Sequence, residues 1–149
     1  CSFFTHTKKS LKSPGMHHAA KHFIVVSPHC TWGWRDRPLT WVHELIAELR
    51  AASYVDDTRI YMAGNSMGGM GTWYLASERP DLYAAIALVS AYHHEGGLET
   101  IPEALSEIPV IVVHSYADET CELKKEEPLW RKFKERGGSI EIHLATGIG

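Results

Sequence analysis

A glycine-rich turn at residues 64–68, with the sequence Gly-Asn-Ser-Met-Gly, constrains the fold of this chain more than any other feature. The apolar run at residues 60–63 leads directly into the turn, and residues 59–63 predict a β-strand. Residues 67–78 follow and predict a helix that ends before Pro80. A strand that turns sharply into a helix is a building unit of α/β proteins, so the turn predicts a fold of that class.

The same alternation of strands and helices continues on both sides of this turn. Apolar runs predict four further strands, and amphipathic segments predict two further helices. Because strands separated by helices pair in parallel, we predict one domain over residues 1–149, with a mostly parallel sheet and helices on both of its faces. Residues 1–21 show little periodicity and predict a loop with room for a short helix. The further strands are predicted at residues 22–27, 83–89, 109–114 and 139–144, and the helices at residues 40–49 and 128–136.

The composition is that of an ordinary globular domain, with 44% hydrophobic and 22% charged residues among 149. The formal net charge is -3 and Lys and Arg form no long cluster, which argues against nucleic-acid binding. No apolar run approaches the ~20 residues that span a bilayer, which argues against membrane insertion. Cys1, Cys30 and Cys121 lack the spacing of zinc or redox sites, so a secreted and a cytoplasmic location both stay open.

The turn also matches the pattern Gly-x-Ser-x-Gly, which places a serine nucleophile between a strand and a helix. In such an elbow, Ser66 adopts a strained backbone conformation and exposes its hydroxyl above the carboxyl end of the sheet. Gly64 and Gly68 are expected where the adjacent strand and helix come too close for a Cβ atom. The backbone N–H of Met67, at the start of the helix, is expected to stabilise an oxyanion. We therefore interpret Ser66 as the nucleophile of a serine hydrolase.

Two other interpretations of this segment use its glycines without the serine. One is a tight strand-to-helix turn with no chemistry, and the other is a phosphate cradle of the dinucleotide kind. The positions of Gly64, Gly68 and Gly69 do not fit the pattern G-x-G-x-x-G, and the chain contains no G-K-[ST] sequence. The nucleophile interpretation is therefore preferred.

A serine nucleophile needs a base and an acid, and in this kind of sheet the acid comes next along the chain and the histidine last. Asp118 lies just beyond the strand predicted at residues 109–114, at the same edge of the sheet as Ser66, and is the predicted acid. Its neighbour Glu119 is the alternative acid. If Asp118 has no catalytic role, it is a solvated turn residue, because aspartate is common in turns.

The base is expected at the carboxyl end of the last predicted strand. His143 alternates with apolar residues inside that strand and is expected on its polar side, in a structural role. His114 precedes the acid in its own strand and is expected to help build the acid loop. His93 and His94 follow the strand before it and can border the substrate pocket, but as bases they would break the chain order.

Two tryptophans, Trp32 and Trp34, follow the strand predicted at residues 22–27 and are expected at the same edge of the sheet. Trp34 is a candidate for lining an acyl or aromatic pocket, together with His93. Packing at a loop corner is an equal alternative, because tryptophan is commonly buried without contacting a ligand.

Residues 59–73 resemble a family of serine esterases known as predicted peptidases, which are related to feruloyl esterases and polyhydroxybutyrate depolymerases. The likeness extends to residues 23–30 and to residues 108–118, and it covers residues 22–149 in all. The resemblance implies an α/β-hydrolase fold and a small-molecule ester or related acyl substrate.

Two departures from the pattern of this family concern the ends of the chain. The family has a strand ending in His-Gly before the position of Phe23, whose loop supplies a second oxyanion donor, and residues 1–21 contain no such strand. Its catalytic histidine follows a Gly-x-Gly after the last strand, which residues 147–149 resemble. We therefore expect a partial domain that lacks the first strands and the C-terminal end. The histidine is expected just beyond Gly149, so this segment alone is expected to be inactive.

The preferred function is the hydrolysis of carboxylic esters through an acyl-enzyme on Ser66, a reaction that requires no metal or cofactor. A serine peptidase would use the same groups on an amide substrate. The alternative that is not an enzyme is a noncatalytic α/β module that binds a ligand or a partner. Its only support is that residues 1–149 contain no histidine at the position expected for the base. The sequence favours no particular oligomeric state.

Overall fold

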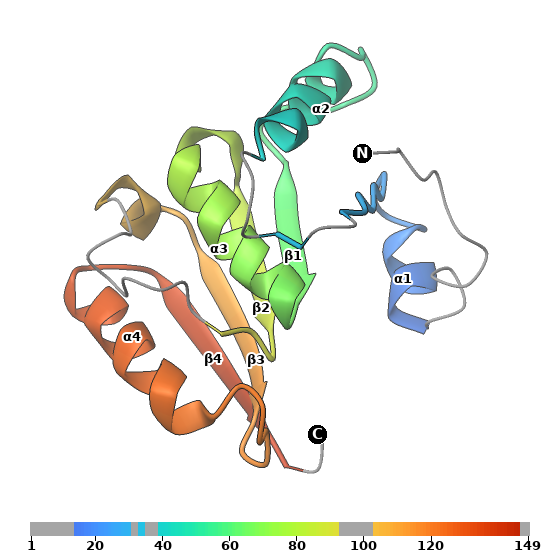
Figure 1. Ribbon diagram of the computed structural model, residues 1–149. Helices are drawn as coiled ribbons and strands as arrows, with labels where there is room; N and C mark the ends of the chain where they lie inside the picture. Colours follow the sequence, from blue (N-terminus) through green and yellow to red (C-terminus); the bar gives the residue numbers. More distant parts are fainter. Residues whose placement is uncertain (1–13, 31–32, 35–38, 93–102, 147–149) are drawn as a thin grey trace. The chain divides into compact units, whose positions relative to one another are not determined.

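The computed structural model describes residues 14–30, 33–34, 39–92 and 103–146 (Figure 1). The chain divides into two compact units, Cys1–Asp36 and Arg37–Gly149. The first unit is short, and the second contains the sheet. The single domain predicted over residues 1–149 stays a prediction.

The first unit contains helix α1 (Pro14–Ala19), but the strand predicted at residues 22–27 does not form. An extended segment becomes a strand only when its backbone N–H and C=O groups pair with a neighbouring strand. The described part of this unit contains no such strand. The prediction was wrong because an apolar run indicates only that a segment suits burial. Whether it joins a sheet depends on a partner that the run does not specify.

The second unit is built on a four-stranded parallel sheet with the strand order β1-β2-β3-β4 (Figure 1). The carboxyl ends of neighbouring strands are aligned, because Val89 pairs with Asn65 on one side and with Val113 on the other. The predicted α/β class is confirmed, as are the four strands that the sequence predicts in this unit. They are β1 (Tyr61–Asn65), β2 (Ala85–Val89), β3 (Val110–Ser115) and β4 (Ile140–Ala145).

Three α-helices and two short 3-10 helices accompany the strands in the described residues of this unit. Helix α4 begins five residues before its predicted start, because the charged run at residues 124–127 forms its largely exposed first turn. None of the helices among the described residues is long and apolar enough to cross a lipid bilayer. The α-helices are α2 (Thr40–Arg50), α3 (Met67–Glu78) and α4 (Leu123–Glu135), and the 3-10 helices are η2 (Pro80–Leu82) and η4 (Glu103–Glu107).

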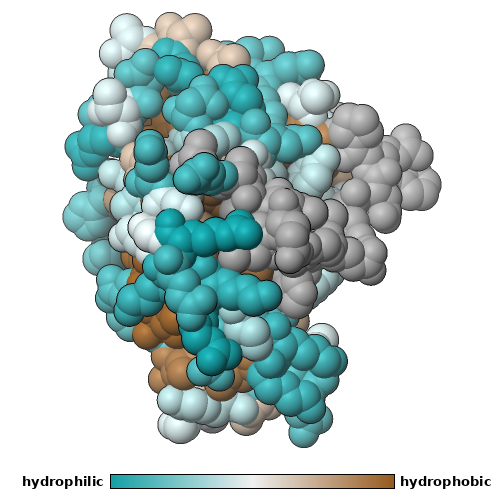
Figure 2. All heavy atoms as spheres, turned by 90° about the vertical axis from the view of Figure 1, so that its left-hand side faces the viewer, coloured by the Kyte–Doolittle hydropathy of each residue, from teal (hydrophilic) through white to brown (hydrophobic). Residues whose placement is uncertain are grey.

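Helices α3 and α4 cover the same face of the sheet (Figure 1). Trp73 of α3 meets Phe133 of α4 edge to face, with ring centroids 5.7 Å apart. Trp130 of α4 packs in the same way on His114 of β3, at 5.4 Å. All four side chains are buried, so they form the core between the two helices and the sheet. Seen from the side on which α4 lies, the surface is mostly hydrophilic, as expected for the solvated outer face of this layer (Figure 2).

The opposite face of the sheet is more open. Tyr61, Ala63 and Ile111 point to that face and are exposed, whereas the residues that alternate with them are half-buried or buried. Helices were predicted on both faces, but the described part of the chain has α3 and α4 on one. The strand order explains this difference. Crossovers between parallel strands are right-handed, so strands added always in the same direction place every connecting helix on the same face.

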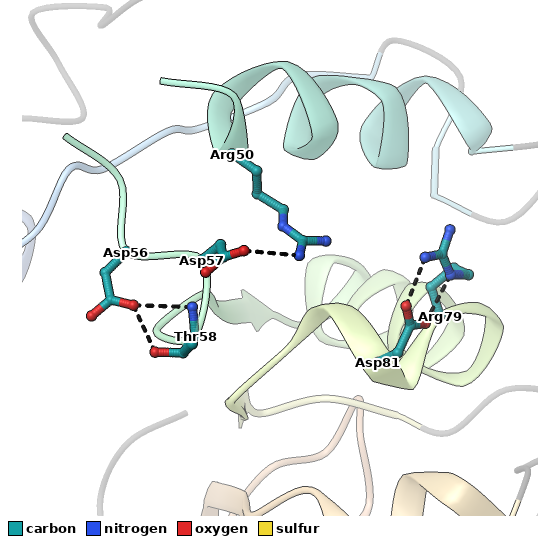
Figure 3. Close-up of polar contacts among 6 residues, drawn as sticks. All are labelled: Arg50, Asp56, Asp57, Thr58, Arg79 and Asp81. Atoms are coloured by element: carbon teal, nitrogen blue, oxygen red, sulfur yellow. Dashed lines mark hydrogen bonds and ion pairs between the residues drawn. The ribbon is translucent and has the colours of Figure 1, made fainter. Parts of the chain in front are cut away.

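Polar contacts orient the loops at the amino ends of the strands (Figure 3). Arg50, at the end of α2, forms an ion pair of 3.2 Å with Asp57. Arg79, just after α3, donates hydrogen bonds of 2.8 and 2.7 Å to Asp81. Between α2 and β1, residues 56–58 form a turn that the aspartate side chain closes. These groups are exposed, so each pair contributes little to stability. These contacts lie at the amino edge of the sheet and take no part in its carboxyl edge.

Candidate active site

Ser66 lies between the last residue of β1 and the first residue of α3, at the carboxyl edge of the sheet (Figure 1). Its backbone has φ 52° and ψ -119°, a conformation that costs a residue other than glycine about 1–3 kcal/mol. Three backbone hydrogen bonds hold it there. The Ser66 N–H donates to Val89 O at 2.9 Å, and the Ser66 C=O accepts from the N–H groups of Gly69 and Met70 at 2.9 and 3.1 Å. The strained strand-to-helix turn predicted from the sequence is confirmed.

The glycines of this turn differ in whether a Cβ atom would fit at their position. A Cβ atom on Gly64 would lie 2.1 Å from the carbonyl oxygen of Gly68, so this position requires glycine as predicted. A Cβ atom on Gly68 would meet nothing within 4 Å, so the predicted close approach at Gly68 is wrong. The second close approach is at Gly69, where a Cβ atom would lie 2.3 Å from the Cβ of Ala91. Gly68 occupies the outer side of the first helical turn, and Gly69 faces the end of β2.

Gly64→Ala is expected to lower the free energy of unfolding by about 3 kcal/mol or more, because the methyl group would overlap backbone atoms of Gly68. Gly68→Ala is the matched control within the same turn. It is expected to change stability by less than about 1 kcal/mol, in the stabilising direction, because alanine favours the helix over glycine. Urea denaturation followed by circular dichroism measures both. Equal destabilisation by the two variants would contradict this account of the turn.

The start of α3 provides N–H groups beside the Ser66 hydroxyl. Met67 is the first residue of this helix, and the first N–H groups of a helix have no acceptor within it. The helix also places partial positive charge at this end. Ser66 occupies the N-cap position, yet its side chain makes no capping hydrogen bond. Its hydroxyl is therefore not used to terminate the helix, and the role of the Met67 N–H as an oxyanion donor stays a prediction.

Asp118 lies in the loop between β3 and α4, at the same edge of the sheet as Ser66. One of its carboxylate oxygens, Oδ1, accepts hydrogen bonds from the N–H groups of Cys121 at 2.8 Å and Thr120 at 3.0 Å. The Cys121 N–H is the main reason that the pKa of Asp118 lies below its usual value, and the opposing effect of burial is smaller. Glu119, the alternative acid, is exposed. Asp118 is therefore the ordered, ionised carboxylate of this loop.

His114 holds the loop between β3 and α4, called the acid loop because it carries Asp118, by a hydrogen bond from β3. Its side chain is 1% exposed, and its Nε2 donates a hydrogen bond of 2.6 Å to the carbonyl of Cys121. This contact agrees with the expectation that His114 helps to build the loop. His143 lies exposed on β4 and pairs through Nε2 with Glu141 at 2.7 Å, as expected for a structural surface residue. Neither ring is placed as a base for Ser66.

Neither of the two predicted pocket residues belongs to the described part of the second unit. His93 lies outside the described residues, as do His94 and Trp32. Trp34 is half-buried and belongs to the first unit, whereas Ser66 belongs to the second. Their role in a substrate pocket stays a prediction.

The structure brings two further residues to this edge that the sequence did not single out. Ser90 directly follows β2, and it is among the groups that lower the pKa of Asp118, after the N–H groups of Cys121 and Thr120. Burial raises the pKa of the Cys121 thiol, which keeps it protonated, and the side chain of Ser66 acts on this pKa in the opposite direction. A signal for Ser90 was present, because it directly follows a strand predicted between the strands that carry Ser66 and Asp118. Nothing in the sequence indicated Cys121, since its contact depends on how the acid loop folds.

Comparison with known proteins gives one consistent result. A model of the family described as "Putative esterase" matches residues 16–143. Cutinase 1 of Thermobifida cellulosilytica is 39% identical over 94 residues, which cover 57% of this chain and 36% of that protein. The bifunctional acetylxylan esterase/xylanase XynS20E of Neocallimastix patriciarum is 27% identical over 122 residues, covering 76% of this chain and 17% of that protein.

Solved structures, an esterase among them, have a similar fold. A thermostable esterase superposes with a TM-score of 0.66 at 31% identity, covering 74% of this chain and 28% of that one. SOBER1 of Arabidopsis thaliana superposes with a TM-score of 0.61 at 20% identity, covering 74% of this chain and 53% of that one, which is a likeness of fold. The chain thus spans between about a sixth and about a half of the proteins compared here.

Proposed function

This chain belongs to the esterase family whose model matches residues 16–143, and we propose that it hydrolyses carboxylic esters through an acyl-enzyme formed on Ser66. The observation that carries the proposal is the conformation of Ser66. A strained serine, held by three backbone bonds at the start of a helix and with no capping bond, is a serine whose hydroxyl is kept available. The similar acetylxylan esterase acts on an ester by name, which supports the same bond for this chain.

In the proposed reaction, the Ser66 oxygen attacks the ester carbonyl while a base takes the hydroxyl proton. The N–H of Met67 donates to the oxyanion of the tetrahedral intermediate. The base then returns its proton to the departing alcohol, which leaves the acyl group on Ser66. A water molecule, deprotonated by the same base, releases the carboxylic acid and restores the serine. No step uses a metal or an organic cofactor.

The base in this proposal is a histidine, and Asp118 orients it and stabilises its charged form. His114 is hydrogen-bonded to the Cys121 carbonyl and His143 is paired with Glu141, so neither is the proposed base. The order of serine, acid and histidine along the chain favours a histidine just after Gly149, which the sequence Gly-Ile-Gly at residues 147–149 would introduce. The residues encoded after Gly149 test this point directly. A continuation without histidine would overturn the assignment and favour a noncatalytic module.

The bond that is cleaved can be determined with matched chromogenic substrates on the full-length protein. We expect turnover of p-nitrophenyl acetate and p-nitrophenyl butyrate, and none of peptide p-nitroanilides, because an amide needs protonation of a poorer leaving group. Faster turnover of the anilides would assign the protein to the serine peptidases instead. No turnover of either class, together with no labelling of Ser66 by a fluorophosphonate probe, would contradict the proposal and favour the binding module.

A further inference from the structure

A series of hydrogen bonds connects the elbow to β3 across the carboxyl ends of the strands. The Ser66 N–H donates to Val89 O at 2.9 Å, and the N–H of Ser90 donates to Val113 O at 2.8 Å. Because Val89 and Ser90 share one peptide group, these two bonds join the elbow to β2 and β2 to β3. The next residue after Val113 is His114, so the series reaches the residue that holds the acid loop.

His114 continues this series into the acid loop. Its Nε2 donates a hydrogen bond of 2.6 Å to the Cys121 carbonyl, and the Cys121 N–H donates one of 2.8 Å to Oδ1 of Asp118. Cys121 is therefore bonded through both of its backbone groups, to β3 on one side and to the acid on the other. Its side chain is buried as well. A displacement of Cys121 would thus move the Asp118 carboxylate.

The other hydrogen bonds of the acid loop fix its shape or its beginning. Oδ1 of Asp118 also accepts from the N–H of Thr120 at 3.0 Å, within the loop itself. The Tyr116 N–H donates to Ala145 O of β4 at 3.1 Å, which holds the loop to the sheet before the acid. The bond from His114 holds it to the sheet after the acid. The acid therefore lies between a backbone bond to β4 and a side-chain bond to β3.

The imidazole of His114 makes this bond in a fixed orientation. Its ring is buried and meets Trp130 of α4 edge to face, with centroids 5.4 Å apart. A carbonyl oxygen only accepts, so the hydrogen lies on Nε2 and Nδ1 carries a lone pair. Nδ1 is buried and has no hydrogen-bond partner within the part of the chain that the structure describes. An unsatisfied buried nitrogen costs about 1–3 kcal/mol, so the benefit of a histidine here lies in its Nε2 bond.

We propose that His114 is a positioning residue for the proposed triad: through the backbone of Cys121, its Nε2–H sets where the Asp118 carboxylate lies relative to Ser66. The inference rests on the proposed esterase function. It adds a second histidine, which transfers no proton and does not touch the substrate. The role goes beyond building the loop, because it makes turnover depend on the hydrogen-bond donor at Nε2 and not on the ring that carries it.

Three substitutions in the full-length protein separate the donor from the ring. His114→Gln places an amide N–H as many bonds from Cα as Nε2, so it can still bind the Cys121 carbonyl. His114→Asn carries the same amide on a shorter side chain that does not reach this carbonyl, and His114→Phe keeps a ring against Trp130 without a donor. We expect kcat for p-nitrophenyl butyrate to fall by about 10- to 100-fold in the asparagine and phenylalanine variants and by less than about 3-fold in the glutamine variant. KM should change by less than about 2-fold in all three.

His143→Gln is the matched control, because His143 lies exposed on β4 and pairs with Glu141. This variant is expected to keep kcat within about 2-fold of the wild type. Circular dichroism at the assay temperature shows which variants are folded, so that rates are compared between folded proteins.

A double-mutant comparison separates positioning from a merely structural role. In an Asp118→Asn background, His114→Asn should lower kcat by less than about 2-fold, because its effect passes through the charge of the acid. A structural role would lower kcat by the same factor in both backgrounds.

The outcomes distinguish this inference from the proposed function. Loss of kcat in a folded donor-free variant, restored by glutamine and absent in the Asp118→Asn background, supports the positioning role. A folded donor-free variant with wild-type kcat would overturn it, as would a glutamine variant that loses as much as the asparagine variant. Donor-free variants that do not fold would assign the bond to stability and also overturn it. Each of these results leaves a Ser66-dependent esterase intact. Ester turnover that is absent, or that persists in Ser66→Ala, would refute the proposed function, and the role of His114 with it.

Discussion

Replacing Ser66 with alanine is expected to lower kcat for p-nitrophenyl butyrate by about 10⁴-fold or more in the full-length protein, because the reaction then has no nucleophile to acylate. Alanine keeps the Cβ atom and meets the same steric limits at φ 52°, and the Ser66 hydroxyl makes no capping bond that the helix needs. The melting temperature should therefore stay close to that of the wild type. Steady-state rates and a fluorophosphonate probe measure the effect, and the probe should label the wild type alone.

Ser77→Ala, a half-buried serine in the same helix α3, is the matched control and should keep both the wild-type rate and the labelling. Equal labelling of the wild type and Ser66→Ala would show that the probe reacts elsewhere. That result would remove Ser66 as the nucleophile.

Replacing Asp118 with asparagine is expected to lower kcat by about 10³- to 10⁴-fold without unfolding the acid loop. Asparagine retains an Oδ1 oxygen, which can still accept the hydrogen bonds from Thr120 and Cys121. It removes the negative charge that would orient the base and stabilise its protonated form. Asp118→Ala removes the charge and also the oxygen that accepts these hydrogen bonds, so it should lose stability as well as activity. Steady-state kinetics and thermal unfolding of both variants separate the two effects.

The neighbouring Glu119→Gln is the control for charge in this loop. Because Glu119 is exposed, its kcat should stay within about 2-fold of the wild type. A large loss in Glu119→Gln with little loss in Asp118→Asn would reverse the assignment and make Glu119 the acid.

The lowered pKa of Asp118 also fixes a pH dependence of stability. A carboxyl group whose folded pKa lies below its unfolded value, about 3.9, stabilises the fold at higher pH. This contribution disappears as the pH falls through the folded pKa, where the carboxylate takes up a proton. Between neutral pH and about pH 3, the melting temperature of Asp118→Asn should therefore fall less steeply than that of the wild type.

The parts of this fold that followed from the sequence are those that local patterns encode. Central strands of a parallel sheet have continuous apolar runs, which is why β2 and β3 were found at their places. The elbow was recognisable because Gly64 and Ser66 meet its steric and chemical demands within five residues. Its position before Asp118 along the chain then indicated which loop could carry the acid.

The parts that did not follow depend on contacts between distant segments. The apolar run at residues 22–27 has no partner strand within the described part of the first unit, and its own composition does not specify one. Which glycine faces β2 depends on how α3 leaves the turn, so the motif suggested Gly68 where the structure has Gly69. A positive φ at Ser90 is invisible in the sequence, because serine is not a residue that marks such a conformation.

The neighbour-to-neighbour strand order has a consequence for the timing of folding during synthesis. Each strand can dock beside the one made just before it, so the sheet can grow in the direction of translation. Val89, whose carbonyl accepts the Ser66 N–H, is synthesised and leaves the ribosome well before Asp118. The strained turn can therefore be completed while the acid loop is still being translated. In such a sequence of events the acid docks onto a finished nucleophile, and errors in β3 or its loop would spare the elbow.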